Sequence, residues 1–408
     1  MELLKELFRS TAVRILSIAA CVLAAALILA NAGVFERSPS EKKNEENQEQ
    51  QAVSAVPVTV IRENADGGTG TAEANADPAV GAAAMSAEED SSAAVDSMAE
   101  AVAGPVPQGE VQITISAAGD CTLAKDDGME YDVSFNASFD EHEPGWFMAG
   151  VHDVFATDDL TIVNLECALS ENGSRDEEKT YAFRGSPEYV RVLTDGSVEA
   201  CNLANNHSFD YGTEAYEDTK QVLEDAGVVS FGYDRSQVIT IKGIKIGLVG
   251  IYELEAGLDS MDLLLQEIEG VQDQGAQLVI VSFHWGDEGS YDVNEVQIEL
   301  AHAAIDAGAN LVLGHHPHRV QGVGRYNGVY IAYSLGNFVF GGNSSPEDMD
   351  CLIFRQTFTF KDGVLRDTDE HLVIPCRISS TTAYNNYQPV ILEEEEADEL
   401  LEKVDSLL

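Results

Sequence analysis

Short apolar runs alternate with amphipathic stretches from residue 111 onward, and this alternation limits the possible folds more than any other feature of the chain. Apolar, β-branched runs that stop at Gly, Asn or Asp are typical of buried strands, and a period of about 3.6 residues is typical of helices. The expected strands are 111–118, 160–166, 198–202, 228–232, 278–283 and 311–313; the expected helices are 146–156, 187–194, 216–226, 263–274 and 295–307. The alternation predicts an α/β domain.

Strand patterns without intervening helices make up much of the rest of the domain. A hairpin is expected over 238–251, with Lys242-Gly243 as its turn, and further strands over 328–334, 351–360 and 364–375. We therefore expect antiparallel strands added to the α/β core. Residues 393–408 form an acidic helical pattern, which we interpret as a solvated cap.

The N-terminal region has the pattern of a membrane anchor. The apolar run 15–35 is close to the roughly 20 residues that cross a bilayer. Basic residues precede the run and acidic ones follow it, which predicts an extracytoplasmic domain and a single-pass protein in the cell membrane. Small residues at Ala30-Asn31-Ala32 leave a cleaved signal as an alternative. Ile18-Ala19-Ala20-Cys21 resembles a lipoprotein cleavage box, although the apolar run continues past Cys21.

Residues 36–109 contain no Phe, Trp or Tyr and are rich in Ala, Glu and Ser. Such a segment cannot bury enough apolar surface to offset its chain entropy. It is expected to be a disordered acidic linker. The predicted organisation is an anchor or signal (1–35), this linker, a catalytic-type domain (110–380) and an acidic helical tail (381–408).

The overall charge excludes one class of partner. The chain has 71 acidic residues against 23 Lys and Arg, a formal net charge of −48. Such a protein repels polyanions, so no nucleic-acid partner is expected. An anionic substrate would need a local cation to overcome this field, which favours a bound metal.

The six cysteines form no CxxC or other close metal-binding spacing. Cys351 and Cys376 flank a hairpin-like segment and could form a disulfide, or they could be buried free thiols. We therefore predict no disulfide scaffold.

Metal-capable side chains stand at or just after the ends of the predicted strands. They are Asp120, Glu166, Asn206 with His207, His284, and His316 with His318. In α/β sheets, ligands bind beyond the carboxyl ends of strands, where loops converge. Carboxylates, an amide and imidazoles together suit Mn, Fe or Zn.

Each of these motifs alone has a simpler structural interpretation. Gly119-Asp120 could be a turn, Glu166 a solvated acid, and Asn206 a helix cap. His284 could be a histidine packed beside Trp285. The His316-Pro317-His318 turn is the strongest local signal, because two imidazoles at i and i+2 can serve one site.

Several motifs occur in a fixed order along the chain: Gly119-Asp120, Asn164-Leu165-Glu166, Asn202-Leu203-Ala204-Asn205-Asn206-His207 with Asp210-Tyr211-Gly212, His284-Trp285-Gly286, Gly314-His315-His316-Pro317-His318 and Ser334-Leu335-Gly336-Asn337-Phe338. Together they resemble the CapA family of capsule and poly-γ-glutamate biosynthesis proteins, in the calcineurin-like metallophosphoesterase superfamily. The resemblance covers roughly residues 111–376. It implies a four-layer α/β/β/α sandwich with a metal centre between its sheets, and an N-terminal anchor.

The resemblance also implies roles for individual residues. Glu166 resembles the bridging acid between two metal sites. Asn206, His284 and His316 would complete one site, and Asp120 and His318 would belong to the other. His207 resembles a histidine that protonates a leaving group, and Asp210 would either orient it or cap the following helix.

One position departs from the superfamily pattern. The first motif is usually Asp-x-His, but here the third residue is Thr122. The second metal site therefore lacks a strong ligand, so one or two ions are both compatible with the sequence.

The expected function is a role in capsule or poly-γ-glutamate synthesis, export or anchoring, through metal-dependent hydrolysis. Arg184 could clamp a phosphate or carboxylate of an anionic polymer or phosphoester substrate, or form a surface salt bridge. One alternative is a non-catalytic subunit that binds membrane-embedded polymer synthase proteins, and another is a general phosphoesterase.

Overall fold

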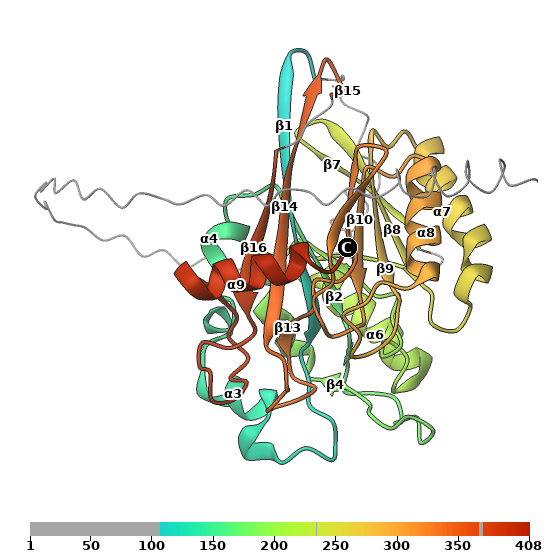
Figure 1. The fold of residues 1–408 in the computed structure, drawn as a ribbon. Helices are drawn as coiled ribbons and strands as arrows, with labels where there is room; N and C mark the ends of the chain where they lie inside the picture. Colours follow the sequence, from blue (N-terminus) through green and yellow to red (C-terminus); the bar gives the residue numbers. More distant parts are fainter. Residues whose placement is uncertain (1–106, 234, 367–369) are drawn as a thin grey trace, which may run out of the picture. The chain divides into compact units, whose positions relative to one another are not determined.

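The computed structural model describes residues 107–408, apart from 234 and 367–369 (Figure 1). The expected anchor, its cleavage alternatives and almost all of the expected linker lie outside the described residues. Within the described part of the chain, no helix is both long and apolar enough to cross a membrane.

The first large sheet combines parallel and antiparallel strands. Its path is β17-β16-β14-β1-β2-β5-β6, with β13 paired to β1 and β15 to β14. The strands are β1 (Glu110–Thr122), β2 (Leu160–Leu165), β5 (Ala200–Asn202), β6 (Val229–Phe231), β13 (Asn337–Phe340), β14 (Asp350–Lys361), β15 (Val364–Leu365), β16 (His371–Arg377) and β17 (Val390–Ile391). β1, β2, β5 and β6 are mutually parallel, whereas β14 is antiparallel to β1 and β16 is antiparallel to β14.

The second large sheet has the order β11-β12-β10-β9-β8-β7. Its strands are β7 (Gln237–Ile241), β8 (Ile244–Tyr252), β9 (Leu278–His284), β10 (Leu311–His315), β11 (Val323–Tyr326) and β12 (Val329–Ala332). The expected hairpin is present as β7 and β8. Its turn residues Lys242 and Gly243 both have positive φ, at 50° and 81°, which matches the tight turn that joins antiparallel strands. A small third sheet pairs β3 (Ala168–Leu169) with β4 (Arg184–Gly185).

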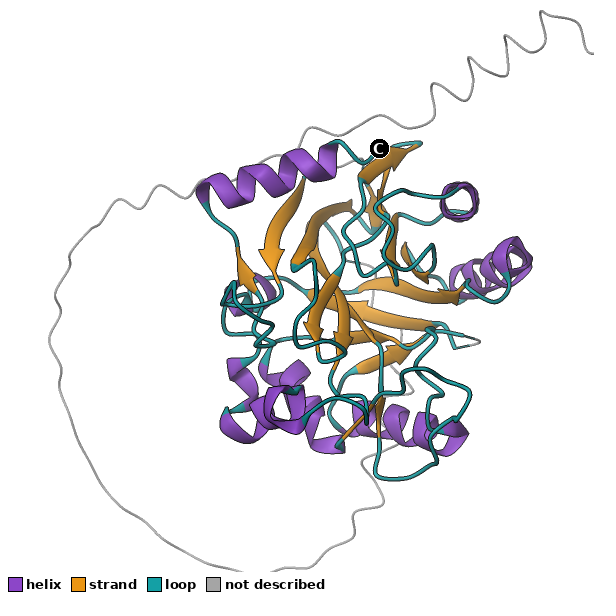
Figure 2. Cartoon of the chain, turned by 60° about the horizontal axis from the view of Figure 1, so that its bottom comes forward, coloured by secondary structure: helices purple, strands orange, loops and turns teal. Residues whose placement is uncertain are grey.

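The sheets and helices lie in layers (Figure 2). Apolar clusters fill the space between these layers. Side chains such as Ile115 and Ile162 of the first sheet share one cluster with Leu248, Ile280 and Leu313 of the second. A second cluster joins the other face of β1, β2 and β5 to α3–α6, and a third joins the outer face of β8 and β9 to α7 and α8. The helices are α3 (Phe135–Glu141), α4 (His152–Phe155), α5 (Val190–Asp195), α6 (Gly212–Asp225), α7 (Met261–Asp273), α8 (Glu295–Asp306) and α9 (Glu394–Asp405). The predicted mixed α/β fold with several sheets is confirmed.

Three segments differ from the expectation. The strand expected over 364–375 is divided into β15 and β16, which pair with different parts of β14. The helix expected over 146–156 is replaced by a 3-10 turn at Pro144–Trp146 and the single-turn α4. Gly150 separates them, and a Cβ there would lie 2.5 Å from the carbonyl oxygen of Pro389, so close backbone packing decides the local structure. The expected C-terminal helix is present as α9, but it is more than a solvated cap. Its Leu400, Leu401 and Val404 are buried in the cluster between the sheets.

The described cysteines are free thiols, and all five are buried. Cys351 and Cys376 lie directly opposite each other on β14 and β16.

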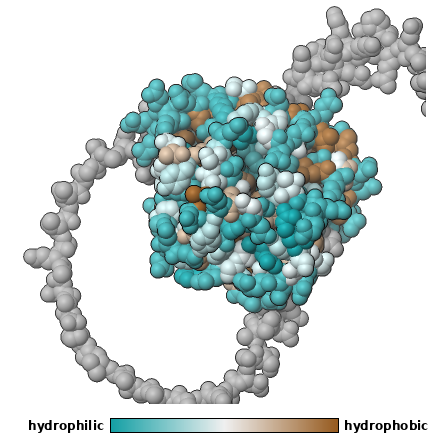
Figure 3. Space-filling model, turned by 90° about the horizontal axis from the view of Figure 1, so that it is seen from below, coloured by the Kyte–Doolittle hydropathy of each residue, from teal (hydrophilic) through white to brown (hydrophobic). Residues whose placement is uncertain are grey.

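The surface of the domain differs from its apolar core. The face shown in Figure 3 is mostly hydrophilic, with isolated apolar patches.

Candidate metal centre

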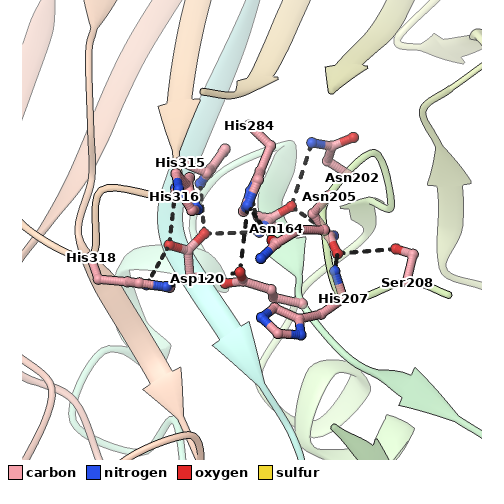
Figure 4. A network of polar contacts seen from close by, with 12 residues as sticks. Asp120, Asn164, Asn202, Asn205, His207, Ser208, His284, His315, His316 and His318 are labelled. Atoms are coloured by element: carbon pink, nitrogen blue, oxygen red, sulfur yellow. Dashed lines mark hydrogen bonds and ion pairs between the residues drawn. The ribbon is translucent and has the colours of Figure 1, made fainter. Parts of the chain in front are cut away.

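The carboxyl ends of parallel strands from both large sheets meet at one place (Figure 4). Asp120 lies near the end of β1 and Glu166 directly follows β2, both in the first sheet. His284 ends β9 and His316 follows β10, both in the second sheet. The layered packing of the sheets therefore brings together side chains that are far apart in the sequence.

Glu166, His316 and His318 form the most compact group of potential ligands. One ligand atom from each lies within 4.8 Å of the others. Glu166 is fully buried, and neither of its carboxylate oxygens has a hydrogen-bond donor within the described chain. A buried carboxylate without donors is costly unless a cation compensates it. This donor set fits a divalent metal ion.

The turn that carries the two histidines is strained. His316 and His318 have φ values of 97° and 53°, in a region that non-glycine residues rarely adopt. The backbone N–H of His316 donates to Oδ2 of Asp120 at 3.2 Å, which ties this turn to the first sheet. Strain of this kind concentrates at functional sites, and here it places both imidazoles beside Glu166.

Asn206 and His284 lie next to Glu166 and add two further potential ligands to Glu166, His316 and His318. Oδ1 of Asn206 lies 2.8 Å from Nε2 of His284, and the same nitrogen lies 3.5 Å from Oε1 of Glu166. The amide oxygen, the imidazole nitrogen and the carboxylate thus face one another at separations that one ion can bridge. Nε2 of His318 lies 3.9 Å from the same Glu166 oxygen.

Asp120 is fully buried beside this group and has several polar neighbours. Its Oδ1 accepts a hydrogen bond from Nδ2 of Asn164 at 2.8 Å. Nδ1 of His318 lies 3.3 Å from its Oδ2, and Nδ1 of His315 lies 3.6 Å from its Oδ1. Thr122, two residues along, is buried and its hydroxyl has no hydrogen-bond partner in the described chain, so it does not replace the missing histidine in these contacts.

Burial and neighbouring charge shape the ionisation of this cluster. Burial raises the pKa of Glu166 well above its usual value, and the nearby Asp120 raises it further. Burial, assisted by the neighbouring imidazoles, lowers the pKa of His284 well below its usual value. Burial also lowers the pKa of His315 and of His316 to about 4. These three imidazoles are therefore neutral near pH 7, the form that binds a metal.

The pKa of His318 moves in the opposite direction. Burial alone would lower it, but the carboxylates of Glu166 and Asp120 raise it to about 9. The pKa of Asp120 is held below its usual value by His318 and His315, although burial opposes this shift. In the absence of a metal, His318 is thus the cation of the cluster.

His207 lies next to the group in a separate network. Its Nδ1 is 2.7 Å from Oδ2 of the fully buried Asp210. The Asp210 carboxylate also accepts the N–H of Phe183 at 2.8 Å and pairs with Nζ of Lys179 at 3.1 Å. Asp210 makes no capping hydrogen bond to α6, whose N-cap is Tyr211. Of the two expected positions for the Asp210 side chain, the structure has the one in contact with His207.

Unlike the other predicted site residues, Arg184 contacts a neighbouring loop and an aromatic ring. Its guanidinium donates to the carbonyl oxygens of Asn172 and Gly173 and lies 4.2 Å from the centre of the Tyr211 ring. These contacts stabilise the 170–174 loop instead of joining the cluster. The cation nearest to His207 in these contacts is Lys179, which also donates to the carbonyl oxygen of Asn206.

Sequence reasoning missed several members of the network. Lys179 carries no sequence signal. His315 stands inside the Gly-His-His-Pro-His motif, and its register pairing with His284 places both side chains on one face. Asn164 and Asn205 belong to quoted motifs, and their contact, Nδ2 of Asn205 to Oδ1 of Asn164 at 3.2 Å, connects the strand ends.

The fold and this cluster define an α/β protein with a candidate metal centre between two sheets. Residues 114–342 match the family described as "Bacterial capsule synthesis protein PGA_cap". The chain therefore belongs to this family of bacterial capsule synthesis proteins, and the resemblance to the CapA family is confirmed.

Individual relatives agree with this assignment. The PGA biosynthesis protein CapA of Bacillus subtilis is 32% identical over 213 residues, which cover 47% of this chain and 55% of the relative. The capsule biosynthesis protein CapA of Bacillus anthracis is 32% identical over 185 residues, covering 40% and 45%. A probable polyglutamine synthesis accessory protein of Mycobacterium tuberculosis is 29% identical over 221 residues, covering 46% and 58%. The chain thus spans about half the length of the curated relatives it matches.

Proposed function

We propose that this protein acts in capsule or poly-γ-glutamate synthesis, export or anchoring through a metal-dependent hydrolase-type site. The observation that carries the proposal is the convergence of His316 and His318 on the buried Glu166 carboxylate, which has no hydrogen-bond donor within residues 107–233, 235–366 and 370–408. Asn206 and His284 contribute further donors on the same side, and Asp120 provides a carboxylate near His318.

A divalent Mn, Fe or Zn ion at these residues would supply Lewis-acid chemistry toward a substrate oxygen and water. His207 supplies the proton for the leaving group, because Asp210 engages its Nδ1 and leaves Nε2 as the transferring atom. The Phe183 ring packs 4.7 Å from the His207 imidazole and restricts its orientation. Lys179 pairs with the other oxygen of Asp210 and fixes the carboxylate.

The names of the relatives and the charge of the site support a substrate class. The relatives are named for capsule, PGA and polyglutamine synthesis, which favours an anionic polymer or a phosphoester in the same pathway. Lys179 and a bound cation would provide positive potential in a chain with a net charge of −48. The same net charge disfavours adhesion to a polyanionic product.

The location belongs to the same proposal. The apolar run at 15–35 and the basic residues before it support a single-pass anchor in the cell membrane, with residues 110–408 outside the cytoplasm. The acidic segment between them would keep this part of the chain away from the bilayer. Membrane-embedded synthase subunits are the expected partners.

A non-catalytic accessory role is the second candidate. Thr122 stands where the superfamily places a histidine ligand, and one relative is named an accessory protein. In that case the metal would stabilise the fold, and the surface would bind the synthase. A general phosphoesterase is a third candidate with the same site.

The test compares metal binding with turnover in the full-length protein. Turnover of phosphoesters and of γ-glutamyl polymer is assayed with Mn or Zn, using His207→Ala and, as a control, His152→Ala, whose side chain is 44% exposed on α4. The hydrolase proposal expects turnover that His207→Ala abolishes and His152→Ala retains, with metal affinity unchanged in both. Metal binding without turnover on any of these substrates would favour the accessory role.

A further inference from the structure

The motif Ser334-Leu335-Gly336-Asn337-Phe338 has no role in the function proposed above, yet one of its side chains contacts a residue of the candidate metal centre. Asn337 begins β13 and is only 3% exposed. Its Oδ1 lies 2.8 Å from Nδ1 of His318, which belongs to the compact ligand group. A buried amide that contacts the non-coordinating edge of a candidate ligand is a positioning group.

Backbone geometry explains how Asn337 reaches this place. The N–H of Asp120 donates to the carbonyl oxygen of Gly336 at 3.0 Å, and Asp120 pairs in register with Asn337 across β1 and β13. A Cβ on Gly119 would lie 1.9 Å from that same carbonyl oxygen. The two glycines therefore permit a close strand approach that sets Asn337 and Asp120 side by side.

This pair surrounds one edge of the His318 ring. Nδ1 faces two oxygen acceptors, Asn337 Oδ1 at 2.8 Å and Asp120 Oδ2 at 3.3 Å. When the ring is neutral, as it must be to bind a metal, the nitrogen that faces two acceptors keeps the proton and Nε2 has the lone pair. Nε2 faces Glu166, at 3.9 Å from Oε1. Phe340 of the same strand packs 5.1 Å from the ring and limits its rotation.

We propose that Asn337 is a positioning residue that, together with Asp120, holds His318 with its Nδ1 protonated and its Nε2 directed at the metal. The inference rests on the proposed metal site. It assigns His318 to the ion shared with Glu166 and His316, and it gives the Ser-Leu-Gly-Asn-Phe motif a function.

Two substitutions distinguish the effect of the Asn337 side-chain oxygen from the effect of the side chain's size. Asn337→Leu keeps the approximate size but removes the acceptor, whereas Asn337→Asp keeps an oxygen at that place. Asn385→Leu is the matched control, because Asn385 is 1% exposed and donates to the carbonyl oxygens of Phe340 and Asn343. The full-length protein is titrated with Mn²⁺ and with Zn²⁺ by calorimetry, and its thermal unfolding is recorded without metal.

Asn337→Leu should weaken metal affinity roughly 10- to 100-fold, as loss of such partners usually does, and Asn337→Asp should restore it. Asn385→Leu should lower the unfolding temperature and leave the affinity unchanged. Wild-type affinity in Asn337→Leu, or an equal loss of affinity in Asn385→Leu, would overturn the inference.

A second readout is independent of metal binding. In the metal-free protein labelled with ¹⁵N-histidine, the Nδ1 proton of His318 should give a protected, downfield resonance that Asn337→Leu shifts upfield. If the wild type binds neither ion, the proposed metal site is wrong. This resonance then tests by itself whether Asn337 positions His318. An unchanged resonance in Asn337→Leu would contradict it.

Discussion

At the scale of single residues, Glu166 is central to the site because it is completely buried and has no hydrogen-bond donor among the residues that the structure describes. A group in this position lowers the stability of the metal-free fold, and a cation reverses that effect. The Glu166 carboxylate therefore favours metal binding but lowers the stability of the metal-free protein.

Glu166→Gln should show both effects at once. Removing the buried charge should raise the free energy of unfolding of the metal-free protein by about 1 kcal/mol. The same change should weaken Mn²⁺ or Zn²⁺ binding by roughly tenfold or more, because a neutral amide is a poorer ligand. Chemical denaturation with and without metal measures both. A variant less stable than wild type without metal would contradict this view of Glu166.

Much of the site could be predicted from residue types at strand ends, because the carboxyl ends of parallel strands converge whatever the loops between them do. Asp120, Glu166, Asn206, His284, His316 and His318 all lie in or beside the cluster. Asn337 and Lys179 could not be assigned, since their contacts depend on strand register and on a loop path that no local pattern encodes.

At the scale of elements, the contact between β1 and β13 determines how the first sheet meets the site. Gly119 and Gly336 are the residues that allow it, and Gly336 has a φ of 72°. The strand pattern of β1 was recognisable from its sequence. Pairing with β13, more than 200 residues later, was not, because the register depends on packing of the whole domain.

Gly119→Ala should disrupt this contact. Its Cβ would lie 1.9 Å from the Gly336 oxygen, so the strands must separate at a cost of about 1–3 kcal/mol. Metal affinity should fall as well, because Asp120 and Asn337 move apart. Gly270→Ala is the control: it lies in α7 with open space around its Cβ position, and should stabilise the protein by about 0.5–1 kcal/mol. Equal stability of the two variants would contradict the close-approach argument.

Helix α9 is fixed to the domain by a charge network as well as by apolar packing. Nζ of Lys403 lies 2.7 Å from Asp350 and 3.2 Å from Asp348. Burial alone would lower the pKa of Lys403, but Asp350 and Asp348 raise it. Burial alone would raise the pKa of Asp348, but hydrogen bonds and the charge of Lys403, together with Tyr291, lower it.

Lys403→Met should therefore lower stability by about 1 kcal/mol near neutral pH. Because the folded pKa of Asp348 is depressed, this contribution is present above its unfolded pKa of about 3.9 and is lost as pH falls through the folded value. The raised pKa of Lys403 sets the alkaline limit, above about 10.4. Unfolding temperatures of wild type and variant should converge at both ends of this window. The exposed Lys361→Met serves as the control, and a pH-independent difference would rule out the charge network.

At the scale of the whole molecule, a strongly acidic chain has a compact, largely buried group of imidazoles and carboxylates among its described residues. The net charge of −48 repels polyanions over most of the surface, so productive contact with an anionic substrate depends on local positive charge. The alternation of strands and helices was sufficient to predict the α/β class. It did not indicate the partial burial of α9, because an acidic composition hides an apolar stripe of four residues.

The central claim is that Glu166, His316 and His318 bind a divalent metal ion. The direct measurement is elemental analysis of the full-length protein after equilibrium dialysis against Mn²⁺, Fe²⁺ or Zn²⁺, for wild type, His316→Ala and the control His302→Ala. His302 lies on α8 and stacks 3.7 Å from the Tyr326 ring, so it has no part in the cluster. Retained metal in wild type and His302→Ala, with loss in His316→Ala, is the predicted result. Wild type without bound metal, or His316→Ala with a full complement of metal, would contradict the claim.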